Sequence, residues 1–316
     1  MISRRGVVIH PYELDEKWLD MMVDLNLNVL GLHPVGGKKA NETLDALLQS
    51  REQLQPLLER AKQMGIAVEY EMHALSWLMP RVLYEKHPEW FRMDDKGQRT
   101  PDFNICASNE EALEYLTHRA QELASLLPTE DHLYYFWIDD VSGYRCHCPK
   151  CAELSASDQQ LTLVNAIQRG VKKSDPLGKT AYLAYLDAIR VPQNAKPEEG
   201  IFLEFAPIRR KTDVSINDPA CSENRQEIAD LENLLAFFGR EDAKVLDYWT
   251  DNSLFSKWTY PPQSFMLNSE VMRRDVQYYE KLGFDSITAF ACYLGEDYRK
   301  LHGCPELSGY KAAFEK

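Results

Sequence analysis

Eight short apolar runs rich in Val, Ile, Tyr and Phe alternate with longer amphipathic segments along this 316-residue chain. The runs occupy residues 6–10, 29–33, 66–73, 133–140, 180–186, 201–208, 244–250 and 286–293. Apolar residues at helical spacing predict helices at 18–25, 44–64, 110–127, 158–171, 227–238, 269–282 and 306–314. Such alternation implies parallel strands joined by right-handed crossovers. Eight units favour closure into a barrel.

We therefore predict an α/β fold, a single (β/α)8 TIM barrel that forms one catalytic domain over residues 1–316, with insertions after strands 3, 4 and 7. The connection between the fifth and sixth runs is short and only weakly helical. A doubly wound open sheet is the alternative, but no glycine-rich phosphate turn follows any of the strands.

Composition restricts the partners of the chain. Lys and Arg number 36 against 49 Asp and Glu, a formal net charge of −13, which argues against nucleic acids and anionic membranes. No apolar stretch of about 18 residues is present to cross a membrane. The apolar run after Arg4 and Arg5 is too short for a signal peptide, so we expect a cytoplasmic protein; a chain whose signal has been removed would look the same. The sequence makes no prediction of oligomeric state.

Polar and aromatic residues gather where the predicted strands end. In barrels of this kind the carboxyl ends of the strands form one mouth, where the chemistry takes place. Sugars need aromatic planes for their C–H faces and polar side chains for their hydroxyls, so we predict a carbohydrate substrate. The candidate binding residues are His10, Tyr12, His33, His73, Tyr185, Glu204, Tyr248, Trp249, Asp251, Asn252 and Tyr293.

The adjacent pair Asp139 and Asp140, at the predicted end of strand four, provides the candidate catalytic residues. Where a strand ends its pleat relaxes, so both side chains can turn toward the mouth. Two neighbouring carboxylates repel, which keeps one protonated as a general acid. The competing interpretation is a solvated turn or a helix N-cap.

Two motif sets carry a family resemblance. Residues 136–141 (FWIDDV), 245–250 (VLDYWT) and 6–8 (GVV) resemble strands of the O-GlcNAcase-type β-N-acetylhexosaminidases. The motifs HPEWF at 87–91, NICASN at 104–109 and CHCPKC at 146–151 resemble a group of uncharacterised bacterial glycosidase-like TIM barrels. This second group is the closer match and covers roughly residues 60–190.

The resemblance implies a glycoside hydrolase, exo-acting on a β-linked hexosaminide or a related sugar, with substrate-assisted retention. Asp139 would orient and polarise the 2-acetamido group, and Asp140 would act as general acid and then as general base. The sequence departs from the O-GlcNAcases in the cysteines after Asp140 and in Asp251-Asn252 after Trp249-Thr250. A conventional mechanism would instead pair Asp140 with Glu204, Asp251 or Glu71, and the separation of the two carboxyls would decide between retention and inversion.

Three of the seven cysteines, Cys146, Cys148 and Cys151, lie within six residues. Structural zinc takes four Cys or His ligands, so this spacing predicts a structural zinc with one further thiol or histidine. Cys106 and Cys221 are both candidates for the fourth ligand. No cofactor is predicted for catalysis. Reduced loop cysteines are the alternative.

Two other functions are compatible with the same residues. One is a carbohydrate-binding barrel without catalysis, which would use the same aromatic platforms. The other is a metal-dependent hydrolase whose ion is held by His10, His33, His73 and Glu71 at the strand ends.

Overall fold

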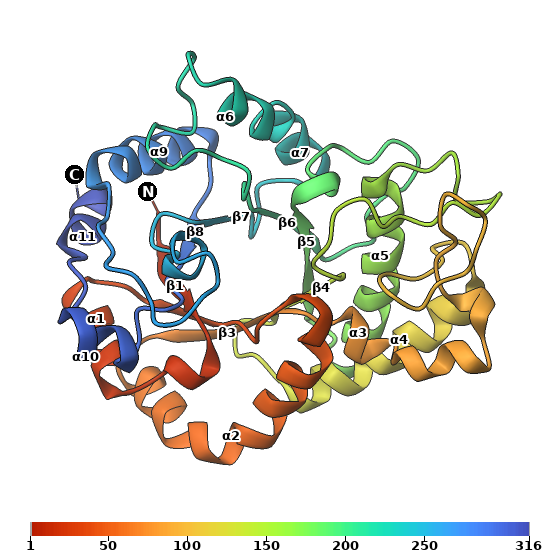
Figure 1. Cartoon of the computed structure of the whole chain (residues 1–316), viewed down its shortest axis with the longest axis horizontal. Helices are drawn as coiled ribbons and strands as arrows, with labels where there is room; N and C mark the ends of the chain where they lie inside the picture. The colour runs from red at the N-terminus through yellow and green to blue at the C-terminus, as the bar shows by residue number, and fades with distance from the viewer. Residues whose placement is uncertain (1, 316) are drawn as a thin grey trace. The chain divides into compact units, whose positions relative to one another are not determined.

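The computed structural model describes residues 2–315 and contains eight parallel strands, closed in the order β1 to β8 (Figure 1). The strands are β1 (Arg4–Ile9), β2 (Val29–Leu32), β3 (Ala67–His73), β4 (Leu133–Trp137), β5 (Lys179–Ala184), β6 (Ile201–Phe205), β7 (Lys244–Asp247) and β8 (Ser286–Phe290). β8 pairs with β1, which closes the barrel. The predicted (β/α)8 barrel is confirmed.

The helices between the strands follow the predicted pattern. They are α1 (Glu16–Asp24), α2 (Ala40–Gln63), α3 (Leu75–Leu78), α4 (Glu110–Leu126), α5 (Ala156–Ser174), α6 (Ser222–Glu227), α7 (Leu231–Phe238), α8 (Asn252–Phe255), α9 (Ser269–Leu282), α10 (Glu296–His302) and α11 (Ser308–Phe314). Between β5 and β6 there is one 3-10 turn, Leu186–Ala188, and no α-helix, as the weak helical pattern there predicts. No helix within residues 2–315 is long and apolar enough to cross a membrane.

Local sequence explains where several helices begin and end. Asn109 caps α4 by accepting a hydrogen bond from the Ala112 N–H, and Ser155 caps α5 through a reciprocal capping box with Asp158. α9 ends at Gly283, whose φ of +93° lies in the region that favours glycine. The short helices α3, α6, α8 and α10 were not predicted, because four to seven residues carry too little periodicity.

The chain divides into two compact units. The first contains residues 2–33, 51–69 and 204–315, and the second contains residues 34–50 and 70–203. In the second unit α4 and α5 lie side by side (Figure 1). In the first unit α9 and α11 pack together.

A buried ionic group in the first unit involves Glu204, one of the predicted sugar-binding residues. Lys244 begins β7, and its Nζ lies 2.6 Å from Oε2 of Glu69 and 3.5 Å from Oε1 of Glu204. Arg4, which begins β1, reaches the other oxygen of Glu69 at 2.6 Å. Burial alone would raise the pKa of Glu69, but Lys244 and Arg4 outweigh it and lower the pKa. Glu204, the fourth residue of β6, thus lies level with Lys244, the first residue of β7, and is part of this buried ionic group.

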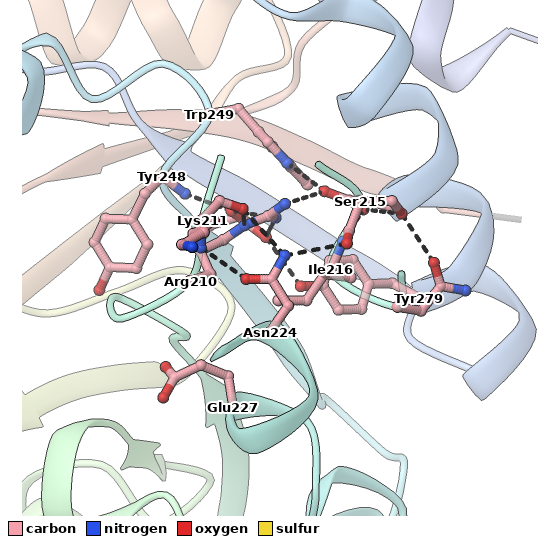
Figure 2. A network of polar contacts seen from close by, with 12 residues as sticks. Arg210, Lys211, Ser215, Ile216, Asn224, Glu227, Tyr248, Trp249 and Tyr279 are labelled. Atoms are coloured by element: carbon pink, nitrogen blue, oxygen red, sulfur yellow. Dashed lines mark hydrogen bonds and ion pairs between the residues drawn. The ribbon is translucent and has the colours of Figure 1, made fainter. Parts of the chain in front are cut away.

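A second buried network joins β7 to α9 in the same unit (Figure 2). Arg210 NH1 lies 2.9 Å from Oδ2 of Asp247, and its NH2 lies 2.7 Å from Oδ2 of Asp275. The hydroxyl of Tyr279 donates to Asp247, and the indole N–H of Trp249 donates to Asp275, both at 2.9 Å. The guanidinium is therefore matched by two buried carboxylates, and it connects the strand to its covering helix.

Candidate functional site

Asp139 and Asp140 follow β4 directly and occupy different surroundings. Asp139 is buried, and its Oδ2 pairs with Arg81 and accepts a hydrogen bond of 2.5 Å from the backbone N–H of Asn104. Both donors come from the segment between β3 and α4. Both of these contacts are to Oδ2. Among residues 2–315, none donates a hydrogen bond to the other carboxylate oxygen, Oδ1. Asp139 is thus an anchored carboxylate with one oxygen left to accept from a ligand.

Asp140 is the more accessible of the pair, with 34% of its side chain exposed. Its Oδ1 accepts a hydrogen bond of 3.0 Å from the Tyr185 hydroxyl and lies 3.9 Å from Nε2 of His73. Nδ1 of His73 lies 2.7 Å from the carbonyl oxygen of Ile138, which directs Nε2 toward Asp140. A half-exposed carboxyl between a phenol and an imidazole is suited to accept and return a proton.

The loop after Asp140 is fastened to the segment after β5. Ser142 Oγ donates to Oδ1 of Asp187 at 2.7 Å, and the N–H of Gly143 donates to Oδ2 of the same carboxylate. Gly143 has a φ of +82°, so the turn requires a residue that tolerates this conformation. These bonds hold the backbone beyond Asp140 in place.

A small cavity of about 50 Å³ lies beside Asp139. One part of its wall consists of residues at and after the ends of β3, β4 and β5, among them His73, Asn104, Asp139 and Tyr185. The rest of the wall is formed by α5 and β5, through Gln159, Gln160, Leu163 and Leu183. Since a single water needs about 10–15 Å³ of such space, the cavity has room for a substituent of a few atoms.

A second group of predicted residues lies in the first unit, after β1 and β8. His10 stacks on Tyr12 with ring centroids 5.2 Å apart, and Nδ1 of His10 lies 2.8 Å from the carbonyl oxygen of His33. The rings of Tyr293 and Tyr260 are 4.3 Å apart. Burial lowers the pKa of His10, so its ring is neutral at neutral pH.

Glu13 supports this aromatic group and was not predicted from the sequence. Its carboxylate accepts hydrogen bonds from the backbone N–H groups of His10, Tyr293 and Gly295 at 3.2, 2.7 and 3.3 Å. Burial raises the pKa of Glu13 to about 7, although these three donors lower it. The metal-binding alternative groups His10 with His33, His73 and Glu71. In the structure the possible ligand atoms of His10, Glu13 and Cys292 lie within 4.8 Å of one another.

The residues predicted around β7 have structural partners. Trp249 is buried with its indole N–H on Asp275, and Tyr248 is buried with its ring stacked on Phe290 at 5.4 Å. Asp251 caps α8 by accepting from the N–H groups of Ser253 and Leu254, and burial raises its pKa to about 6. Trp249 therefore presents no open ring to a ligand.

Asn252, buried like its neighbours, donates from Nδ2 to the carbonyl oxygens of Gln263 and Tyr293. It holds the loop that follows α8 against the end of β8. Like Asp251, it contributes to backbone structure.

The three clustered cysteines come together with Cys106, while Cys221 belongs to the other unit. Polar residues that contact the predicted ones or the loop after Asp140, but were not themselves predicted, include Arg81, Asn104 and Asp187 in the second unit and Glu13 in the first. Asn104 belongs to a quoted motif, and its φ of +54° is a local feature that sequence alone does not reveal. Arg81 and Glu13 carry no sequence signal beyond their place shortly after a strand.

The fold is similar to solved structures of glycoside hydrolases. A catalytic mutant of the GH42 β-galactosidase Gan42B from G. stearothermophilus is 13% identical, with a TM-score of 0.54 over 91% of this chain and 51% of that chain. The β-galactosidase from Rahnella sp. R3 is also 13% identical, with a TM-score of 0.52 over 91% and 50%. A mutant of the family 5 enzyme PbGH5A from Prevotella bryantii B14, solved with a xyloglucan tetradecasaccharide, is 11% identical, with a TM-score of 0.54 over 96% and 87%.

This chain spans about half the length of the two β-galactosidases. At these identities the likeness shows a shared fold. A search of curated proteins found no match. A family model described as a domain of unknown function, DUF4838, matches residues 41–303. Because that match covers most of the chain, the protein belongs to the DUF4838 family.

Proposed function

We propose that this protein is a glycoside hydrolase whose general acid and base is Asp140. The observation that carries the proposal is the contrast within the pair: Asp139 is buried and anchored by Arg81 and Asn104, while Asp140 is half-exposed beside His73 and Tyr185. Two adjacent carboxyls in different surroundings can take different roles in one reaction. The likeness of the barrel to those of glycoside hydrolases supports the same class.

The preferred substrate is a terminal β-linked 2-acetamido sugar, which the enzyme removes in an exo-acting manner. Asp139 offers Oδ1 to the N–H of the acetamido group, and the small cavity beside it suits a substituent of that size. Arg81 pairs with Oδ2 of Asp139 and balances its charge, which leaves Oδ1 to accept from the substrate. The resemblance of residues 136–141 to the O-GlcNAcase-type enzymes is consistent with these roles.

The reaction proceeds in two balanced steps. The acetamido oxygen attacks the anomeric carbon, the glycosidic bond breaks, and the proton of Asp140 passes to the leaving oxygen. The acetamido N–H meanwhile donates to Asp139. Water then attacks the same carbon, Asp140 takes the proton from the water, and the acetamido group is released. Two inversions give overall retention of configuration.

A panel of nitrophenyl glycosides tests the proposal. It includes β-linked N-acetylglucosaminide and N-acetylgalactosaminide, and the glucoside and galactoside that lack the acetamido group. We expect release of nitrophenol from an acetamido sugar and at least about 100-fold less from its hydroxyl counterpart, because the nucleophile is then missing. Equal cleavage of both would contradict the substrate-assisted mechanism. No cleavage of any glycoside, together with saturable sugar binding, would instead support the non-catalytic carbohydrate-binding barrel.

A further inference from the structure

Four of the seven cysteines form one buried cluster in the second unit. Cys106 comes from the segment before α4, and Cys146, Cys148 and Cys151 come from the loop after β4. The four Sγ atoms all lie within 4.8 Å of one another. The other three, Cys221, Cys292 and Cys304, lie outside the cluster, and all seven have free thiols.

The spacing of the sulfurs matches a single tetrahedral ion. Zn–S bonds of about 2.3 Å place the sulfurs of a tetrahedron about 3.8 Å apart. Sγ of Cys106 lies 3.6 Å from Sγ of Cys148 and 3.9 Å from Sγ of Cys151. A disulfide would need a sulfur separation of about 2.0 Å. An iron–sulfur cluster places its own sulfides and several irons among the thiolates, so it needs a wider cage.

The surroundings supply donors for charged sulfurs. The backbone N–H of Met93 donates to Sγ of Cys146 at 3.3 Å, and Arg99 NH1 approaches the same sulfur at 3.8 Å. The hydroxyl of Ser108 lies 3.5 Å from Sγ of Cys148. Four thiolates around a divalent ion carry a net charge of about −2, which Arg99 partly offsets. Such outer contacts orient the ligands of a metal.

The cysteine loop is also held by a buried glutamine. Oε1 of Gln159 accepts from the N–H of Cys146 at 2.8 Å, and Nε2 of Gln159 donates to the carbonyl oxygens of Cys146 and Cys151 at 2.9 and 3.1 Å. Gln159 of α5 therefore holds the backbone of the loop in place. Because the loop is already ordered, less chain entropy is lost when its three thiols bind an ion.

We propose that Cys106, Cys146, Cys148 and Cys151 bind one structural zinc ion as a tetrathiolate. The ion joins the segment after β3 to the loop after β4. All four ligand positions belong to the protein, so no position is open for substrate, as expected of a structural site.

The site has a consequence for Asp139, and this part alone rests on the proposed function. Cys106 lies two residues after Asn104, whose N–H donates to Asp139 and whose Nδ2 donates to the carbonyl oxygen of Tyr144 at 3.1 Å. Tyr144 in turn lies two residues before Cys146. The zinc therefore holds the backbone on both sides of the Asn104–Tyr144 hydrogen bond, through Cys106 and Cys146. Asn104 is thus a positioning residue that is held by the metal.

Metal analysis of the full chain tests the site without any assay of activity. We expect about one zinc ion per chain after expression in zinc-supplemented medium. Cobalt(II), added after zinc is removed with a chelator under reducing conditions, should give the intense visible bands of a tetrahedral tetrathiolate. Cys106→Ser and Cys148→Ser should lose the zinc, while Cys221→Ser and Cys304→Ser should keep it.

Several outcomes would overturn the proposal. One is protein that holds less than about a tenth of an equivalent of zinc and whose four cluster thiols are all alkylated. Another is a cobalt spectrum typical of an octahedral centre. A third is a site that binds iron when zinc is also offered. The cobalt titration uses the native chain, so it decides the matter even where a Ser variant fails to fold. Faster amide hydrogen exchange at 102–109 and 138–155 after zinc removal, with the strands unchanged, would support the positioning role.

Discussion

Asp140 depends on close packing by a residue that has no side chain. A methyl group added at Gly36 would lie 3.0 Å from Cδ2 of His73 and 3.1 Å from Oδ2 of Asp140. The φ of Gly36 is −75°, so its backbone would accept any residue, and the requirement is for space alone.

Gly36→Ala should therefore shift His73 and Asp140 and lower kcat/KM about 10- to 100-fold, the usual result of a small misplacement of reacting groups. Steady-state kinetics on the substrate found in the glycoside panel measures the effect. Val35→Ala is the matched control, because Val35 is exposed next to Gly36 and its truncation adds no contact. Full activity in Gly36→Ala would show that this contact does not matter.

Glu13 makes the stability of the fold depend on pH. Its pKa rises from 4.5 to about 7 on folding, so below about pH 4.5 both the folded and unfolded states are protonated. As the pH rises toward 7, the unfolded state ionises first and the folded state loses relative stability. The rise corresponds to about 3 kcal/mol across the interval. Asp251 acts in the same direction, from 3.8 to about 6.

Urea unfolding of the wild type and of Glu13→Gln at pH 4.5 and pH 7.5 tests this prediction. The variant should show a smaller loss of stability at the higher pH, because the amide does not ionise. Glu16→Gln, an exposed change on the neighbouring helix α1, should leave the pH dependence as in the wild type. Parallel pH profiles for wild type and Glu13→Gln would refute the assignment.

At the scale of elements, the Arg210 network shows how one strand is fixed to its helix (Figure 2). Arg210, Asp247 and Asp275 have fully buried side chains. A buried carboxylate that loses its cation is strongly unfavourable, whereas a neutral replacement of the whole group costs much less.

Arg210→Met should lower the free energy of unfolding by about 3–5 kcal/mol, measured by urea denaturation. Adding Asp247→Asn and Asp275→Asn to the same chain should recover part of that loss, because the uncompensated charges are removed. Arg209→Met, at the adjacent exposed position, should change the free energy by no more than about 0.5 kcal/mol. A small effect in Arg210→Met would mean that the network contributes little.

For the whole molecule, the barrel was predictable because eight buried parallel strands leave a repeated apolar signal in the sequence. The short helices and the exact helix boundaries were less predictable, because capping and tertiary contacts determine them. Even the missing helix between β5 and β6 was visible as weak periodicity.

The candidate site was predictable in part. Asp139 and Asp140 stood out because they are adjacent and follow a strand, but their partners Arg81 and Asn104 come from an irregular segment whose path the sequence does not specify. Glu204 was predicted to bind sugar because a strand carries it, but the strand register brings it beside Lys244. Trp249 was predicted as a sugar platform, and its indole instead meets Asp275.

The dependence of the rate on the leaving group is the measurement that tests the role of Asp140 most directly. Aryl glycosides of the cleaved sugar, from dinitrophenyl to unsubstituted phenyl, are compared in wild type and Asp140→Asn. We predict a loss of about 10²–10⁴-fold in kcat/KM for the phenyl glycoside, which needs a proton on its leaving oxygen, and little loss for the dinitrophenyl glycoside, which does not. An equal loss across the whole series, or none at all, would contradict the assignment of Asp140 as the general acid.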